Sequence, residues 1–176
     1  MTDLRTERLL LRQWRDDDRE PFAELNADPE TMRYFPATRT REQSDAMVDW
    51  ASGLIDERGW GLWAVEAVDL APFVGFVGLN VPRFWPEVTE VGWRLRREHW
   101  GNGYATEAAR EALRYGFEEL GLDEIVAFTT VSNAPSRRVM ERIGMTHDPS
   151  RDFDHPNAPA GPLKRHVLYA TRPPTS

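Results

Sequence analysis

Residues 97–108, which read REHWGNGYATEA, combine a glycine-rich turn with the start of a helix. Gly101, Gly103 and Ala105 stand at alternate positions directly before a segment with helical periodicity. The first turn of a helix exposes main-chain amides, and the helix dipole adds roughly half a positive charge there. Residues with little or no side chain let an anion approach that main chain. The spacing therefore predicts a site for a phosphate or pyrophosphate group.

Two common phosphate-binding patterns do not fit this segment. The pattern GxxxxGK[ST] needs a lysine, and no lysine occurs between Met1 and Leu163. The dinucleotide pattern GxGxxG needs a third glycine where Thr106 stands, which disfavours a nicotinamide-dependent oxidoreductase. The pattern [Q/R]xxGxG/A remains, with Trp100 at its first position.

Hydrophobic periodicity divides the rest of the chain into the helices and strands that must position this loop. We expect helices at 16–28, 40–58, 105–120 and 135–143, and strands at 4–14, 61–68, 73–81, 89–96, 124–131, 145–147 and 165–171. The strand–helix–strand unit from 89 to 131 predicts two parallel neighbours joined by a crossover. The remaining strands favour hairpins, so the fold class is α+β, a mixed α/β sheet flanked by helices.

Composition limits the classes of function. The 176 residues fit one domain, which we place at 1–172, with 173–176 as a frayed tail. The absence of cysteine excludes disulfides and a cysteine nucleophile, and the four histidines lack metal-ligand spacing. A formal net charge of -7 disfavours nucleic acid and attracts cationic ligands such as amines. We expect a cytoplasmic monomer or homodimer with no metal and no membrane partner.

Three segments resemble the GNAT superfamily of acyl-CoA N-acyltransferases. The stretch WGNGYA is similar to the pyrophosphate loop of that superfamily. The start TERLLLR is similar to the first strand of its Rim-type branch, whose founders acetylate ribosomal-protein N-termini, and SNAPSRRVMERIGM is similar to a later motif of that branch. The resemblance covers residue 4 to about residue 169. It implies the GNAT fold, with a mixed, mostly antiparallel sheet of about seven strands and one parallel β-α-β crossover.

The resemblance also implies that acetyl-CoA is the co-substrate. The residues expected to contact it are Trp93, Leu95, Arg96, Arg97, Trp100, Gly101, Asn102, Gly103, Tyr104, Ala105, Thr106 and Asn133. Trp100 replaces the usual Gln or Arg, so phosphate binding must rest on main-chain amides. Asn133 has a second interpretation, because its side chain could instead cap the helix that follows.

Transfer of an acetyl group to an amine needs a base, because a protonated amine cannot attack a thioester. Glu90 is the first candidate. It points away from the face that carries Val91 and Trp93, and members of the superfamily often place a catalytic glutamate on this strand. Glu87 and His155 are the alternatives.

The departing thiolate can take a proton from a nearby acid. Met140 stands where many members of the superfamily carry a tyrosine in this role, so Ser136 at the helix start is the expected donor. Trp85, Glu87 and His155 are expected to line the acceptor site. We therefore predict an N-acetyltransferase that transfers directly, in a ternary complex, to a protein N-terminal α-amine or a small-molecule amine. The missing tyrosine leaves a non-catalytic acyl-CoA-binding sensor as the alternative.

Overall fold

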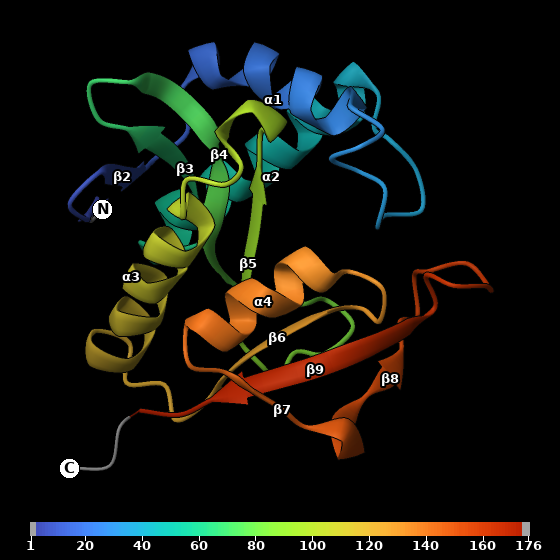
Figure 1. Cartoon of the computed structure of the whole chain (residues 1–176). Helices are drawn as coiled ribbons and strands as arrows, with labels where there is room; N and C mark the ends of the chain where they lie inside the picture. Colours follow the sequence, from blue (N-terminus) through green and yellow to red (C-terminus); the bar gives the residue numbers. More distant parts are fainter. Residues whose placement is uncertain (1–2, 174–176) are drawn as a thin grey trace.

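The computed structural model describes residues 3–173, so the expected tail lies outside the described residues except for Pro173. Those residues form one nine-stranded sheet in the order β1-β2-β3-β4-β5-β6-β9-β7, with β8 also paired to β9 (Figure 1). The strands are β1 Leu4–Arg5, β2 Leu9–Arg12, β3 Leu62–Ala67, β4 Ala71–Asn80, β5 Glu90–Leu95, β6 Ile125–Thr130, β7 Thr146–His147, β8 Phe153–Asp154 and β9 Arg165–Thr171. The helices are α1 Arg19–Ala27, α2 Arg41–Arg58, α3 Tyr104–Glu118 and α4 Ala134–Arg142.

The strand pairing confirms the expected fold class. β5 and β6 pair in parallel across the α3 crossover, and the other strand pairs are antiparallel. Helices cover both faces of the sheet. Phe76 of β4 contacts Phe22 of α1, whereas Leu79 of the same strand points at Gly116 of α3. No helix within residues 3–173 is both long and apolar enough to cross a membrane.

The number of strands differs from the expected seven at two places. The segment 4–14 is a hairpin rather than one strand, with Leu4 opposite Leu11. Glu107 of α3 fixes its turn, because its carboxylate accepts hydrogen bonds from the Thr6 hydroxyl at 2.6 Å and the Arg8 amide at 3.0 Å. β8 lies inside the expected loop between the last two strands. A two-residue strand shows no periodicity, so the sequence pattern could not reveal it.

Local signals explain where the long helices begin and end. Thr40 and Gln43 form a capping box at the start of α2, and Gly59 ends that helix with φ at +81°. α3 begins directly after Gly103, as the loop predicts, and ends at Glu118, two residues before the expected end. The start of α3 therefore lies next to the end of β5, where the phosphate site was expected.

Candidate functional site

The neighbouring strands β5 and β6 pair over a very short length. Glu90 and Val126 are the one register pair between them, and the Val126 amide donates to the Thr89 carbonyl at 2.9 Å. Beyond this point the two strands diverge, and α4 begins directly after β6 (Figure 1). The β6-facing main chain of β5 beyond Glu90 therefore has no strand partner and can bind an extended ligand.

Glu90 lies at the point where the two strands separate. Its side chain is half-buried, and its carboxylate accepts a hydrogen bond from the Asn80 amide at 3.0 Å. Burial raises the pKa of Glu90 to about 7, and the Asn80 hydrogen bond opposes the rise. A carboxyl group with a pKa near neutral pH is suited to accept and release protons there.

The glycine loop has the open geometry that its sequence predicts. Gly101 and Gly103 both have φ at +78°, a backbone conformation that favours glycine. Glycine at these positions is therefore explained by the turn as well as by the room that an anion needs. Gly103 is the N-cap of α3, so it offers no capping side chain. Glu107 is the first residue whose amide bonds within this helix, to the Gly103 carbonyl at 3.0 Å. The amides of the three residues between them lack a helical acceptor, which suits an anion. These residues are Tyr104, Ala105 and Thr106.

Side chains of the loop brace its own backbone. The Trp100 indole donates to the Leu95 carbonyl at 2.9 Å, and the Asn102 amide donates to the His99 carbonyl at 3.1 Å. Trp93, on the α3 face of β5, is half-buried against the core. These hydrogen bonds hold the loop in place. The expected contacts of these side chains with the coenzyme stay predictions.

Arg96 and Arg97 point toward α1 and its flank rather than toward the loop. Arg96 pairs with Glu24 at 2.9 Å and with Glu98 at 2.7 Å, and Arg97 lies 3.8 Å from Asp28. Two carboxylates thus pair with Arg96, whereas Arg97 is exposed and only loosely paired, and a coenzyme contact at either position stays a prediction.

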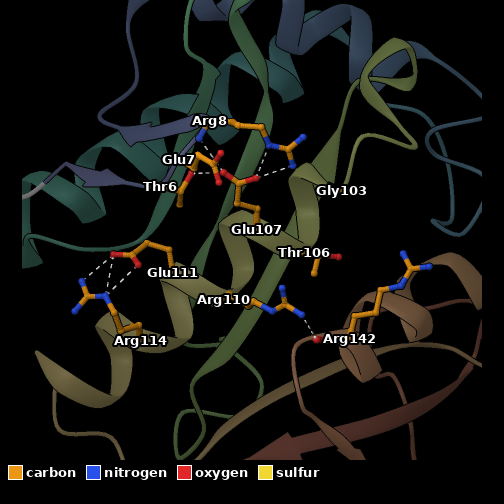
Figure 2. A pocket seen from close by; sticks show the side chains of 10 residues that line it. All are labelled: Thr6, Glu7, Arg8, Gly103, Thr106, Glu107, Arg110, Glu111, Arg114 and Arg142. Carbon is orange, nitrogen blue, oxygen red and sulfur yellow. Dashed lines mark hydrogen bonds and ion pairs between the residues drawn. The ribbon is translucent and has the colours of Figure 1, made fainter.

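A groove of about 740 Å³ extends from Gly103 along the exposed side of α3. Figure 2 shows that its walls come from the β1–β2 turn, α3 and the end of α4. Arg8 closes one side through its ion pair with Glu107 at 2.6 Å, and Arg110 donates to the Arg142 carbonyl at 2.7 Å. Four arginines line this groove beside the uncapped helix start: Arg8, Arg110, Arg114 and Arg142. Arg8 and Arg114 already pair with glutamates, whereas Arg110 and Arg142 have no carboxylate partner within residues 3–173 and suit a phosphate ligand.

The start of α4 shows the capping alternative for Asn133. Its side-chain oxygen accepts from the Ser136 amide at 3.3 Å, and its amide group donates to the Thr129 hydroxyl at 2.8 Å. Contact between Asn133 and the coenzyme stays a prediction. Ser136 is half-buried, and its hydroxyl makes no hydrogen bond to residues 3–173, so it is free to donate. Met140 is buried in the core and has no proton to give.

Six half-buried aromatic rings form a cluster near the end of β6, on the same face of the sheet as Glu90. Phe128 of β6 is two residues beyond Val126, the register partner of Glu90. The ring centroids of neighbouring members lie 4.6–6.2 Å apart. The members are Phe84, Trp85, Phe128, Phe153, His155 and His166. The structure thus joins Trp85 and His155, both expected at the acceptor site, with rings that the sequence pattern did not single out.

The two alternative bases differ from Glu90 in their surroundings. Burial, together with the nearby charges of His166 and Lys164, lowers the pKa of His155 to about 4. A neutral imidazole of such low pKa is a weak base. Glu87 is exposed in the β4–β5 loop. Of the three, Glu90 has the surroundings best suited to a base at neutral pH.

Sequence reasoning missed several residues on this face. Asn80 lies directly opposite Glu90 on β4, and Arg94 follows Glu90 by four positions on β5. Strand alternation could have placed Arg94 on the same face, but only the fold shows its partner Asn26 of α1. No group of three or more metal-ligating side chains gathers anywhere in residues 3–173.

Comparisons with known proteins agree on one family. A model described as "Acetyltransferase (GNAT) domain" matches residues 8–146. The chain is 37% identical over 148 residues to the uncharacterized protein YkkB of Bacillus subtilis, covering 82% of this chain and 85% of YkkB. It is 34% identical over 177 residues to the FsC-acetyl coenzyme A-N(2)-transacetylase of Aspergillus fumigatus, covering 95% of this chain and 74% of that protein.

A solved structure extends the similarity to the whole fold. The crystal structure of the acetyltransferase (GNAT family) from Bacillus anthracis matches with a TM-score of 0.82 at 29% sequence identity. The match covers 97% of this chain and 98% of that chain. The loop, the diverging strands and the uncapped helix therefore lie within a match that spans almost the entire molecule.

Proposed function

Because this chain belongs to the GNAT family of acyl-CoA-dependent N-acetyltransferases, we propose that it acetylates a primary amine by direct transfer in a ternary complex. The observation that carries the proposal is the position of Glu90. Its carboxyl group lies where β5 and β6 separate, and its pKa is raised to about 7. The acceptor is a protein N-terminal α-amine or a small-molecule amine, and the Rim-type branch stays a prediction.

The described residues fit the phosphate end of acetyl-CoA. The free amides after Gly103 and the arginines of the groove offer donors to the pyrophosphate and to a further phosphate. The unpaired main chain of β5 offers hydrogen bonds to an extended arm that reaches toward Glu90. When bound, acetyl-CoA supplies the activated acetyl group.

The reaction then needs few groups from the protein. The amine nitrogen attacks the thioester carbonyl carbon, and Glu90 accepts the proton that the nitrogen loses. Main-chain amides of β5 beyond Glu90 are placed to stabilise the developing oxyanion. As the carbon–sulfur bond breaks, the sulfur takes a proton from the Ser136 hydroxyl and leaves as the thiol of coenzyme A. Ser136 then regains a proton from solvent, and Glu90 releases its proton to solvent. The products are an N-acetylated amine and free coenzyme A.

A thiol-release screen tests this proposal. Acetyl-CoA and the protein are incubated with panels of peptides, amino acids, polyamines and aminoglycosides, and mass spectrometry identifies any acetylated product. We expect thiol release that depends on one class of amine and yields its acetyl derivative. Binding of acetyl-CoA without thiol release from any amine would overturn the proposal in favour of an acyl-CoA sensor.

A further inference from the structure

Two arginines are buried within residues 3–173, and their surroundings differ sharply. Arg12 is 3% exposed and pairs with Asp18 at 2.8 Å and with Glu66 at 3.0 Å. Arg94 is 8% exposed and has no carboxylate partner within that range. Its one hydrogen bond runs from Nη1 to the Asn26 side-chain oxygen at 2.6 Å, and its buried Nε has no partner. A buried charge without a counter-ion is costly, which marks Arg94 as unusual in this fold.

The surroundings of Arg94 add positive charge instead of removing it. Burial and the nearby charge of Arg39 lower the pKa of Arg94 to about 9, so the guanidinium stays charged at neutral pH. Arg39 is exposed, its own amide donates to the Asn26 carbonyl at 2.9 Å, and it has no ion pair among the described residues. The rings of Phe35 and Phe76 lie 4.3 Å and 5.4 Å from the guanidinium carbon. They cover its faces but supply no counter-ion.

Arg94 shares a strand face with Glu90. Along β5, Glu90, Gly92 and Arg94 alternate with residues that face α3, so all three point toward the α1 side. A Cβ built at Gly92 meets nothing within 4 Å, whereas at its β4 neighbour Gly78 backbone from the α2–β3 loop fills the space. The face therefore presents a base, an open position and a cation in sequence, over about 13 Å of strand.

The free edge of Arg94 matches a carboxylate. With Nη1 bound to Asn26, the Nε and Nη2 groups form the edge that holds a carboxylate by two parallel hydrogen bonds. Phe35, which lies over one face of the guanidinium, is itself 36% exposed, so this face of Arg94 is covered by a side chain at the protein surface.

We propose that Arg94, with Arg39 beside it, binds a carboxylate of the acceptor. The acceptor class is then a primary amine that carries a carboxylate several bonds away, such as an ω-amino acid or a short peptide. This inference rests on the proposed function, since it places the amine of the same molecule at Glu90. The open position at Gly92 gives room for the part of the acceptor that joins the two groups.

Matched acceptors test the inference with the wild-type protein. We compare ω-amino acids of increasing length with the corresponding ω-amino amides, measuring kcat/KM by thiol release and affinity by calorimetry on the complex with coenzyme A. We expect kcat/KM to be at least tenfold higher for the acid than for the amide at one chain length, and this chain is longer than that of glycine. Equal kcat/KM and equal affinity for acid and amide would overturn the carboxylate site while leaving amine acetylation intact. Absence of thiol release with every amine would instead overturn the proposed function, and the calorimetric comparison would still decide the carboxylate site.

Two variants separate binding from a structural role. Arg94→Gln should raise KM tenfold or more for the carboxylate acceptor and change kinetics with the amide little. Arg39→Gln, a change at an exposed position, should raise KM several-fold for the carboxylate acceptor and change KM for the amide little. Arg5→Gln, a change at another exposed arginine far along the sheet, is the control and should change neither. An equal loss with both acceptors in Arg94→Gln, without any selectivity in Arg39→Gln, would show that Arg94 merely anchors α1.

Discussion

The pKa values of Glu90 and His155, which lie on the same face of the sheet, are shifted in opposite directions. Burial raises the pKa of the Glu90 carboxyl to about 7, whereas burial and neighbouring positive charge lower the pKa of the His155 imidazole to about 4. Both shifts favour the neutral form of the side chain. Near pH 7 the carboxylate of Glu90 is therefore much the stronger base of the two.

The raised pKa of Glu90 has a consequence for stability. The unfolded chain loses this proton near pH 4.5 and the folded chain near 7, so the folded state binds more protons between these values. Stability contributed by the neutral carboxyl is full below about pH 4.5 and is lost as pH rises toward 7.

Glu90→Gln should therefore stabilise the fold at pH 8 relative to wild type, by up to about 3 kcal/mol, because an amide is never ionised. The gain should disappear near pH 4. Urea unfolding at both pH values measures it, with Glu87→Gln at an exposed position as the control. A Glu90→Gln variant no more stable than wild type at pH 8 would show that the carboxylate is not destabilised by burial.

For single residues, the alternation along a strand predicts on which face of the sheet each side chain lies. The pattern of β5 places Glu90 on the face opposite Val91 and Trp93, and the structure shows this orientation, whereas its role as the base stays a prediction. The partners Asn80 and Asn26 were not found, because they lie on other elements whose register and approach only the fold sets.

At the scale of elements, the loop before α3 is the feature that the sequence described best. Gly101 and Gly103 have positive φ, and the helix begins without a capping side chain. The turn geometry explains why these positions are glycine whether or not an anion binds, so only a variant with a matched strain control can separate the two reasons.

Gly103→Val should weaken acetyl-CoA binding by more than tenfold, because a branched side chain at the helix start blocks approach to the free amides. Gly121→Val is the matched control. Gly121 also has positive φ, at +65°, and lies in the turn after α3, so it carries a similar backbone strain of about 1–2 kcal/mol. Calorimetry with acetyl-CoA measures both variants. Equal affinities would mean that the loop glycines serve the turn alone.

Long periodic elements were predictable and short ones were not. α3 and the parallel β5–β6 pair follow from an apolar stripe and from the crossover rule. The β1–β2 turn depends on Glu107, about a hundred residues away, and β8 exists because β9 offers it an edge. Such contacts leave no local periodic signal, and this is why the strand count was too low.

At the scale of the whole molecule, Arg12 joins parts of the chain that are far apart in sequence. Its guanidinium bonds to Asp18, to Glu66 of β3 and to the Pro72 carbonyl at the start of β4. Both Arg12 and Asp18 are buried, so without Asp18 the Arg12 charge keeps only Glu66 as a carboxylate partner among residues 3–173.

Asp18→Asn should lower the free energy of unfolding by about 2 kcal/mol, because Arg12 loses the buried carboxylate that binds its Nη1 and Nη2 while Glu66 keeps its Nε. Asp16→Asn is the control, since the Asp16 side chain is 97% exposed and pairs only with Arg19. Denaturant unfolding of the two variants measures the difference. Similar stabilities would contradict the role of the buried pair in holding β2, β3 and β4 together.

The central claim is that this molecule acetylates an amine with Glu90 as the base, and the pH dependence of kcat/KM tests it most directly. The wild-type profile should rise through an apparent pKa near 7, and this step should stay in place when an α-amine acceptor is replaced by a lysine-type amine.

Glu90→Gln should remove that step and lower kcat/KM by about 100-fold while acetyl-CoA affinity is preserved, and Glu87→Gln should leave both the step and the rate unchanged. A Glu90→Gln enzyme that keeps the wild-type rate and the step near pH 7 would contradict the account.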